Sequence, residues 1–198
     1  MESQKTFSFQ IENSAIGVLF INDSIPVATG FVMGKPNWVI TCAHVDVLAP
    51  GEKFFQAIGS KVKVRLKLLN VSYEGDIAIY EADTLISNKP LLMDTSFKFE
   101  TKKTIVYLGF DQKLSTTVDT KILIRKSIIE AAGIIEVGKL KTRFIEFVGE
   151  GIPGYSGGPV FNTQGEVIAI FTQSFYRKGL KSISKEILVN RAFSIWPL

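Results

Sequence analysis

Ser156 lies in the segment that most directly indicates chemistry, the glycine-rich run Gly-Tyr-Ser-Gly-Gly-Pro at residues 154–159. Glycine adopts backbone conformations that other residues disfavour, so backbone N–H groups in such a turn can lie close to a substrate. Pre-positioned N–H groups of this kind stabilise the oxyanion of a tetrahedral intermediate. The segment therefore predicts a nucleophilic serine, although an ordinary glycine-rich β-turn has the same composition.

His44 is the only histidine in the chain and ends the β-rich run at residues 39–44. A lone histidine is more often structural than catalytic. Its side chain nevertheless has an ordinary pKa of about 6.5, which suits the deprotonation of a serine near neutral pH. Asp76 precedes the apolar segment 77–80, where an acid is commonly a turn residue. A carboxylate that accepts from one ring nitrogen of a histidine fixes its tautomer and stabilises the imidazolium, so Asp76 is the candidate orienting residue.

The elements that must position these residues are mainly short strands. Residues 61–68 alternate Lys or Arg with Val or Leu, which predicts a half-buried strand with a solvated basic face rather than a binding stripe. Other strands are predicted at residues 15–21, 27–33, 38–42, 54–58, 76–80, 104–108, 118–124, 142–148, 160–161 and 166–171. A short helix is predicted near residues 184–188, and residues 81–99 are interpreted as a crossover between two halves. This pattern is typical of an all-β barrel or sandwich.

The segments around His44, Asp76 and Ser156 resemble the chymotrypsin-like serine peptidases, most closely the HtrA-type branch. The resemblance extends to residues 28–32, 105–109, 161–170 and 192–195. It implies an all-β fold of two orthogonal six-stranded antiparallel β-barrels with the active site in the cleft between them. Residues 1–90 would form the barrel that carries His44 and Asp76, and residues 91–198 the barrel that carries Ser156 and the oxyanion loop.

The resemblance also implies the role of each residue. His44 would act as base, Asp76 as orienting residue and Ser156 as nucleophile, with the N–H groups of Gly154 and Ser156 as oxyanion donors. It implies no metal or organic cofactor and a polypeptide substrate. Tyr155 departs from the family, because digestive members have Asp there and HtrA-type members usually have Asn, so activation by N-terminal cleavage is not expected. The sequence ends at residue 198, so no PDZ domain is expected.

Substrate preference has two open interpretations. Glu150 precedes Ser156 by six residues, the place that forms the base of the primary pocket in digestive members, and a carboxylate there could bind Lys or Arg. Glu150 also lies between two glycines, as an exposed loop acid would. Pocket walls are expected from two segments, in which bulky phenylalanines would favour small apolar residues: Ile170, Phe171 and Thr172, and residues 192–194 with Phe193.

Composition limits the class of protein. A formal net charge of +4 is distributed along 198 residues, so nucleic-acid binding is not expected. Cys42 is the single cysteine, expected as a buried packing residue, and excludes an intrachain disulfide. With no signal peptide evident, this predicts a cytoplasmic location. The apolar runs are shorter than the roughly 20 residues of a membrane helix, and the oligomeric state is not indicated.

The function predicted from these features is hydrolysis of peptide bonds through an acyl-enzyme on Ser156. The alternative is a catalytically silent double barrel that acts as a protein-binding module, because a fold does not determine a function. The presence of all three candidate residues favours the peptidase.

Overall fold

The computed structural model describes residues 12–112, 121–178 and 186–195. The first of its two halves is a closed six-stranded antiparallel barrel in the order β1-β2-β3-β6-β5-β4. Its strands are β1 (Ile16–Ile21), β2 (Ile25–Val32), β3 (Trp38–Thr41), β4 (Lys53–Ala57), β5 (Val64–Ser72) and β6 (Ile77–Ala82). A 3-10 turn, η1 (Asn13–Ala15), precedes β1, and the helix α1 (His44–Leu48) follows β3.

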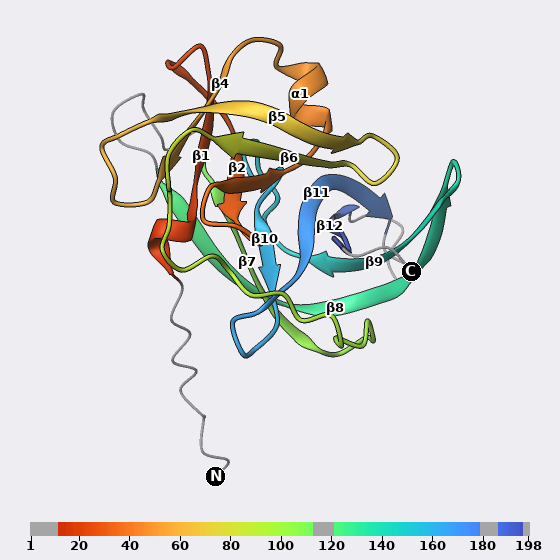
Figure 1. Ribbon diagram of the computed structural model, residues 1–198. Coiled ribbons are helices and arrows are strands. Elements are labelled where there is room, and N and C mark those ends of the chain that lie inside the picture. The colour runs from red at the N-terminus through yellow and green to blue at the C-terminus, as the bar shows by residue number, and fades with distance from the viewer. Residues whose placement is uncertain (1–11, 113–120, 179–185, 196–198) are drawn as a thin grey trace.

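The second half is also a closed six-stranded antiparallel barrel, in the order β10-β11-β12-β9-β8-β7. Its strands are β7 (Thr104–Phe110), β8 (Ile122–Val137), β9 (Leu140–Val148), β10 (Pro159–Phe161), β11 (Val167–Lys178) and β12 (Glu186–Phe193). Figure 1 shows the first barrel above and the second below, with the long β8–β9 hairpin extending to the right. The predicted all-β double barrel is confirmed.

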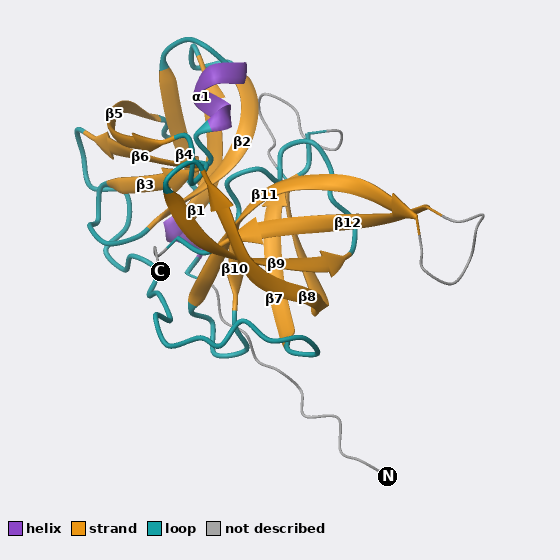
Figure 2. Ribbon diagram, turned by 90° about the vertical axis from the view of Figure 1, so that its right-hand side faces the viewer, coloured by secondary structure: helices purple, strands orange, loops and turns teal. Residues whose placement is uncertain are grey.

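The two barrels lie against each other, as the ribbon in Figure 2 shows in a view turned by 90°, and buried side chains connect them. One cluster of buried side chains fills the first barrel and continues across the interface to Leu108, Phe161 and Ile170 of the second. A second cluster, rich in aromatic rings, fills the second barrel around Tyr107 and Phe147. Because apolar contacts connect the halves, the groups that each barrel carries are held at a defined separation.

Several local predictions differ from the structure. The strand predicted at residues 61–68 begins at Val64, and of its aliphatic residues only Leu66 is buried. A bulge between Leu68 and Asn70 interrupts the alternation, so Leu68 is 38% exposed. Val62 lies outside the strand and is 66% exposed.

The helix predicted near residues 184–188 is wrong from residue 186 onward, where β12 begins; residues 184–185 lie outside the described part. Pairing of β12 with β9 and β11 overrides the local helical propensity there. The predicted strand at 118–124 begins at Ile122 within the described residues, and β8 continues to Val137 because β9 pairs along it.

The predicted crossover follows β6. Between Ala82 and Thr104 the chain has only isolated bridges, Met33 with Leu91 and Met93 with Val167. The division of the chain at residue 90 stays a prediction. No helix among the described residues is long and apolar enough to cross a membrane.

Candidate active site

His44 is the first residue of α1, which follows directly on the end of β3. The helix is short, and polar contacts attach it to the first barrel. The Tyr80 hydroxyl of β6 donates to Asp46 Oδ1 at 2.8 Å, and Lys53 Nζ of β4 lies 3.5 Å from the same oxygen. These contacts compensate for the missing side-chain cap at Ala43 and fix the start of the helix, where His44 lies.

Asp76 lies in the turn between β5 and β6. Gly75 N donates to Ser72 Oγ at 3.1 Å, and Asp76 N donates to Tyr73 O at 3.3 Å. Asp76 has φ of +52°, in the left-handed region that aspartate adopts more readily than most residues. This turn directs its carboxylate toward His44 of the neighbouring segment.

The Asp76 carboxylate binds His44 at two places. His44 N donates to Oδ1 at 2.9 Å, while ring atom Nδ1 lies 3.0 Å from Oδ1 and 2.9 Å from Oδ2. An ionised carboxylate only accepts, so Nδ1 carries the proton in this pair and Nε2 is left as the acceptor. The side chains are 33% and 19% exposed, respectively, so the pair is partly shielded from water.

Ser156 lies in a turn that packs against the first barrel. Thr29 N of β2 donates to Ser156 O at 2.9 Å, and Gly157 N donates to Phe171 O at 2.9 Å. Gly157 has φ of +82°, and a Cβ built there would lie 2.1 Å from Thr41 Oγ1. A side chain at this position is therefore excluded by both conformation and contact, which explains the glycine after Ser156.

The Ser156 side chain points toward β11. Its Oγ lies 3.5 Å from Thr172 O, a long hydrogen bond, and among the described residues it makes none with His44. The N–H groups of Gly154 and Ser156, predicted as oxyanion donors, donate to no acceptor in the described part of the chain. Gly154 has φ of +104°, a conformation that favours glycine.

Cys42 is fully buried beside the pair, and its Sγ lies 3.2 Å from Phe171 O. Burial raises the pKa of the Cys42 thiol well above its usual range, and the nearby Asp76 charge raises it further. The thiol is therefore protonated and unreactive, as a packing residue requires.

Cys42, His44 and Asp76 are the only group of potential metal ligands found among the described residues, with ligand atoms within 4.8 Å of one another. Metal binding would require the thiolate and would break the hydrogen bonds between Nδ1 and the carboxylate. The donor set therefore does not favour a metal, and the absence of a cofactor stays a prediction.

The residues predicted to form the primary pocket differ in their exposure to solvent. Glu150 is 67% exposed, and its Oε2 accepts from Arg125 Nη2 at 2.8 Å and Nε at 3.1 Å. The side chains of Ile170 and Phe171 are buried in the two hydrophobic clusters, and Thr172 and Phe193 are 3% and 9% exposed. Their role as pocket walls, like that of Glu150, stays a prediction.

Sequence reasoning missed a neutral polar cluster beside the 149–151 loop. Asn190 of β12 is fully buried; its Nδ2 donates to Gly149 O at 3.1 Å, and its Oδ1 accepts from Ser174 Oγ at 2.7 Å. A Cβ at Gly151 would lie 1.9 Å from Ser174 Oγ, so the loop packs tightly on the cluster. An asparagine within the otherwise apolar run at residues 187–190 was the available signal.

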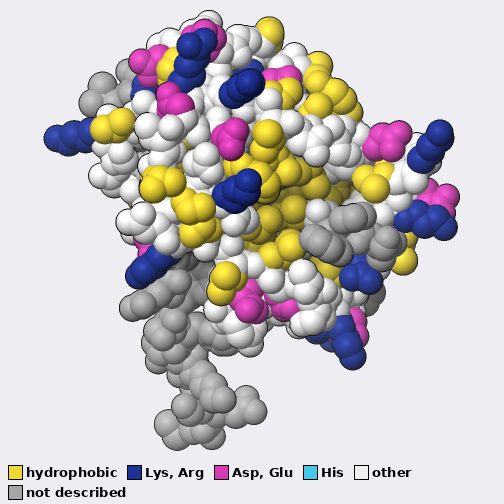
Figure 3. Space-filling model, in the orientation of Figure 1, with side chains coloured by type: hydrophobic (Ala, Val, Ile, Leu, Met, Phe, Trp, Pro, Cys, Tyr) yellow, Lys and Arg dark blue, Asp and Glu magenta, His cyan; other side chains and the backbone are white. Residues whose placement is uncertain are grey.

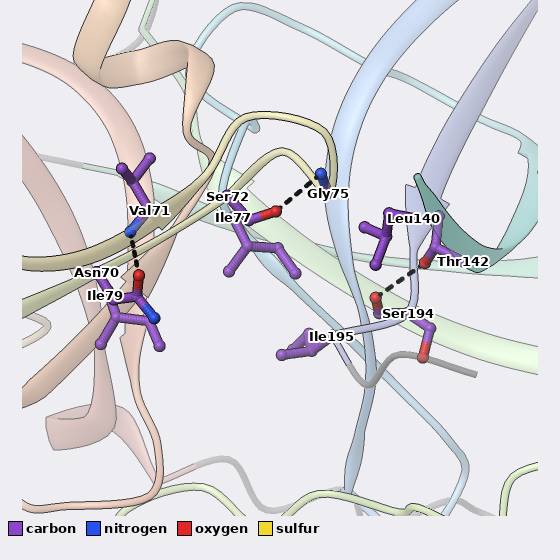
Figure 4. Close-up of a pocket in the computed structure, with 10 residues that line it drawn as sticks. All are labelled: Asn70, Val71, Ser72, Gly75, Ile77, Ile79, Leu140, Thr142, Ser194 and Ile195. Atoms are coloured by element: carbon purple, nitrogen blue, oxygen red, sulfur yellow. Dashed lines mark hydrogen bonds between the residues drawn. The ribbon is translucent and has the colours of Figure 1, made fainter. Parts of the chain in front are cut away.

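A cavity of about 310 Å³ lies between the barrels (Figure 4), but none of the three candidate residues lines it. Its walls combine the β5–β6 hairpin with the second barrel, and the lining residues are Asn70, Val71, Ser72, Gly75, Ile77, Ile79, Leu140, Thr142, Ser194 and Ile195. Hydrophobic side chains gather between the barrels on the face drawn in Figure 3, where no histidine is visible. The cavity lies next to Asp76 along the chain, because Gly75 and Ile77 line it, but the three candidate side chains do not open into it.

Comparison with known families gives a match over most of the chain. The sequence model of the family described as "Trypsin-like peptidase domain" matches residues 28–170. This segment includes His44, Asp76 and Ser156.

Curated relatives are similar over three quarters of the chain. A protein of Pseudomonas putida named "Probable periplasmic serine endoprotease DegP-like" is 26% identical over 158 residues, which cover 77% of this chain and 30% of the relative. A protein of Hahella chejuensis with the same name is 28% identical over 154 residues, which cover 76% of this chain and 30% of that relative. This chain thus spans about 30% of the length of these relatives.

These relatives correct the predicted location. Their names place them in the periplasm, so the cytoplasmic prediction is wrong. A single cysteine excludes an intrachain disulfide in any compartment, and it therefore does not distinguish a reducing compartment from an oxidising one.

Solved structures show the same fold. The HtrA-type protease AlgW with a tripeptide has a TM-score of 0.71 and 20% identity, covering 92% of this chain and 57% of the other. Rv3671c from M. tuberculosis, in a Ser343Ala mutant described as the inactive form, has a TM-score of 0.70 and 16% identity. The match covers 92% of this chain and 82% of the other. The expected chymotrypsin-like arrangement of two barrels is thereby confirmed.

Proposed function

Because this chain belongs to the trypsin-like peptidase family and has HtrA-type relatives, we propose that it is a serine endopeptidase with Ser156, His44 and Asp76 as its catalytic residues. The observation that carries the proposal is the bidentate contact of the Asp76 carboxylate with the backbone and ring of His44. It leaves Nε2 as a base, in a barrel that also binds the Ser156 backbone through Thr29. That arrangement supports general-base catalysis.

The proposed reaction proceeds in two halves. Ser156 Oγ forms a bond to the substrate carbonyl carbon while its proton passes to His44 Nε2, and the negative oxygen is stabilised by the N–H groups of Gly154 and Ser156. The C–N bond then breaks, and His44 returns the proton to the leaving amine. Water attacks the acyl carbon and loses a proton to His44; the bond from that carbon to Ser156 Oγ then breaks, His44 returns the proton to Oγ, and the acid product leaves.

The substrate is a polypeptide, and the surroundings of the candidate pocket support an uncharged residue before the cleaved bond. Asn190 and Ser174 are neutral and already satisfy one another, whereas the Glu150 carboxylate is exposed and paired with Arg125. Of the two interpretations of substrate preference, we therefore favour small apolar residues. The periplasmic names of the relatives support an extracytoplasmic location.

The catalytically silent barrel remains the second candidate because Ser156 Oγ is directed to Thr172 O rather than to His44. Labelling of the purified chain by a fluorophosphonate distinguishes the two. We expect wild type and the exposed control Ser96→Ala to label, Ser156→Ala not to label, and His44→Ala to label at least about 100-fold more slowly. A folded wild-type chain that does not label would establish the silent module instead.

A further inference from the structure

Thr29 of β2 is fully buried at the interface between the barrels, and all of its polar atoms are hydrogen-bonded. Its N–H donates to Ser156 O at 2.9 Å, and its hydroxyl donates to Gly154 O at 2.7 Å. The same hydroxyl accepts from Phe110 N at 2.7 Å, while Thr29 O accepts from Thr41 Oγ1 at 2.8 Å. One residue of the first barrel thus binds two alternate carbonyl groups of the loop that carries the candidate nucleophile.

The two remaining carbonyl groups of this loop are also bound. Pro153 O accepts from Gln112 N at 3.3 Å, and Tyr155 O accepts from Gly158 N at 2.9 Å. A trans peptide unit is planar, so its C=O and the following N–H point in opposite directions. Binding of these two carbonyls therefore orients the N–H groups of Gly154 and Ser156, and these two are the N–H groups with no acceptor in the described part of the chain.

The side chain between these two N–H groups is held by apolar packing. Tyr155 is fully buried, with its ring centroid 5.7 Å from that of Phe171 and 6.1 Å from that of Tyr107. Its hydroxyl has no hydrogen-bond partner among the described residues. A carboxylate here would need a cation, such as a newly cut N-terminus, to become buried; a tyrosine in an aromatic cluster has no such requirement.

Rotation of the Gly154–Tyr155 peptide unit would remove the Gly154 carbonyl from the Thr29 hydroxyl. Thr29 Oγ1 would then lose its acceptor in a buried environment, which is unfavourable. The contact consequently disfavours other arrangements of the loop. Because Thr29 is fully buried, it acts on the loop through these hydrogen bonds.

We propose that Thr29 is the positioning residue of the oxyanion loop, residues 153–156, and that its hydroxyl holds the loop ready for reaction without an activating cleavage or ligand. This inference rests on the proposed peptidase function and adds how the site is regulated. It predicts that the hydroxyl matters for stabilising the transition state more than for binding the substrate.

The test compares Thr29→Val, which keeps the shape but removes the hydroxyl, with Thr29→Ser, which retains it. Peptide hydrolysis gives kcat and KM, and a peptide boronic acid, which forms a tetrahedral adduct with a nucleophilic serine, gives an affinity. We expect Thr29→Val to lower kcat at least about tenfold with KM within about twofold, to weaken boronate binding in parallel, and to be rescued by Thr29→Ser.

Thr142→Val is the matched control, because Thr142 is a buried threonine of the second barrel that makes no hydrogen bond with residues 153–156 in the described part of the chain; its hydroxyl lies 3.4 Å from Ser194 O. It should keep wild-type kcat. A folded Thr29→Val chain with kcat within twofold of wild type would overturn the proposal, as would an equal loss in Thr142→Val.

A measurement on wild type keeps the proposal testable even if Thr29→Val does not fold. Active-site titration should show the boronate adduct forming without a lag and without an added activator peptide. A lag, or a requirement for the activator, would overturn the ready loop while leaving the peptidase function intact. If the wild type neither hydrolyses peptides nor forms the boronate adduct under any of these conditions, the proposed function itself is refuted.

Discussion

At the scale of single residues, Asp76 determines the state of His44. Its carboxylate binds the backbone N–H and Nδ1 of the same histidine, so ring orientation and tautomer are set together. The turn that allows this requires φ of +52° at Asp76. Asn, which tolerates the left-handed region as well, would keep the turn but lose the charge that stabilises an imidazolium.

Glu150 provides a test of substrate preference at this scale. Its exposed carboxylate is paired with Arg125, and such surface pairs contribute about 0–1 kcal/mol. We expect Glu150→Gln to change the cleavage profile of a peptide library by less than about twofold at every residue type. Glu100→Gln, which alters a similarly exposed acid paired with Lys103, serves as control. A selective, tenfold or greater loss of cleavage after Lys or Arg in Glu150→Gln would restore the electrostatic role of Glu150.

At the scale of elements, the turn that carries Ser156 depends on strands of the other barrel. Thr29 of β2 and Thr41 of β3 lie where a side chain of residue 157 would be, with Thr29 O at 2.3 Å from the ideal Cβ position. Gly157 thus allows the nucleophile turn to pack directly on the first barrel. The register of β2 and β3 is therefore part of the candidate site.

Gly157→Ala separates this contact from backbone strain when it is compared with Gly59→Ala. Both glycines have φ near +80°, but a Cβ at Gly59 meets nothing within 4 Å. We expect strain of about 1–3 kcal/mol in both variants and an additional loss from the clash in Gly157→Ala alone. Urea unfolding measures the difference, and fluorophosphonate labelling should be lost only in Gly157→Ala. Equal destabilisation of the two variants would show that the close packing at residue 157 is not needed.

At the scale of the whole molecule, both interiors contain buried phenols. Burial raises the pKa of Tyr107 to about 12, and it also raises the pKa values of Tyr80 and Tyr155. Each phenol thus keeps its proton in the folded state above the pH at which an unfolded chain releases it. The unfolded state then binds fewer protons, so the free energy of unfolding decreases as pH rises.

The resulting pH window follows from the Tyr107 values. Stability from this group is fully present below the ordinary pKa of 10.0 and is lost as pH rises toward about 12. We expect urea midpoints to decline above pH 10 in wild type and to decline less steeply in Tyr107→Phe. Tyr73→Phe is the control, because that side chain is 59% exposed. An identical decline in Tyr107→Phe and wild type would exclude this explanation.

The strand pattern predicted an all-β fold, the resemblance to the HtrA-type peptidases predicted the double barrel, and the sequence supplied the three candidate residues. Two-residue alternation and turn residues are local signals, so most strands of both barrels could be predicted within a few residues. Two elements differ from the prediction: β12 begins where the end of a helix was predicted, and β8 extends beyond the predicted strand because it pairs with β9. In both cases, pairing with distant strands outweighed the local pattern.

Only the tertiary structure revealed how the candidate residues are supported. The hydrogen bond of Thr29 to Gly154 joins residues 125 positions apart, and Asn190 and Ser174 meet through the register of two strands. Hydrogen bonds between distant residues depend on how the barrels pack, and a single sequence carries no local periodicity that encodes them. The chemistry could therefore be proposed from residue types, whereas the arrangement of the candidate residues was decided by the packing of one barrel against the other.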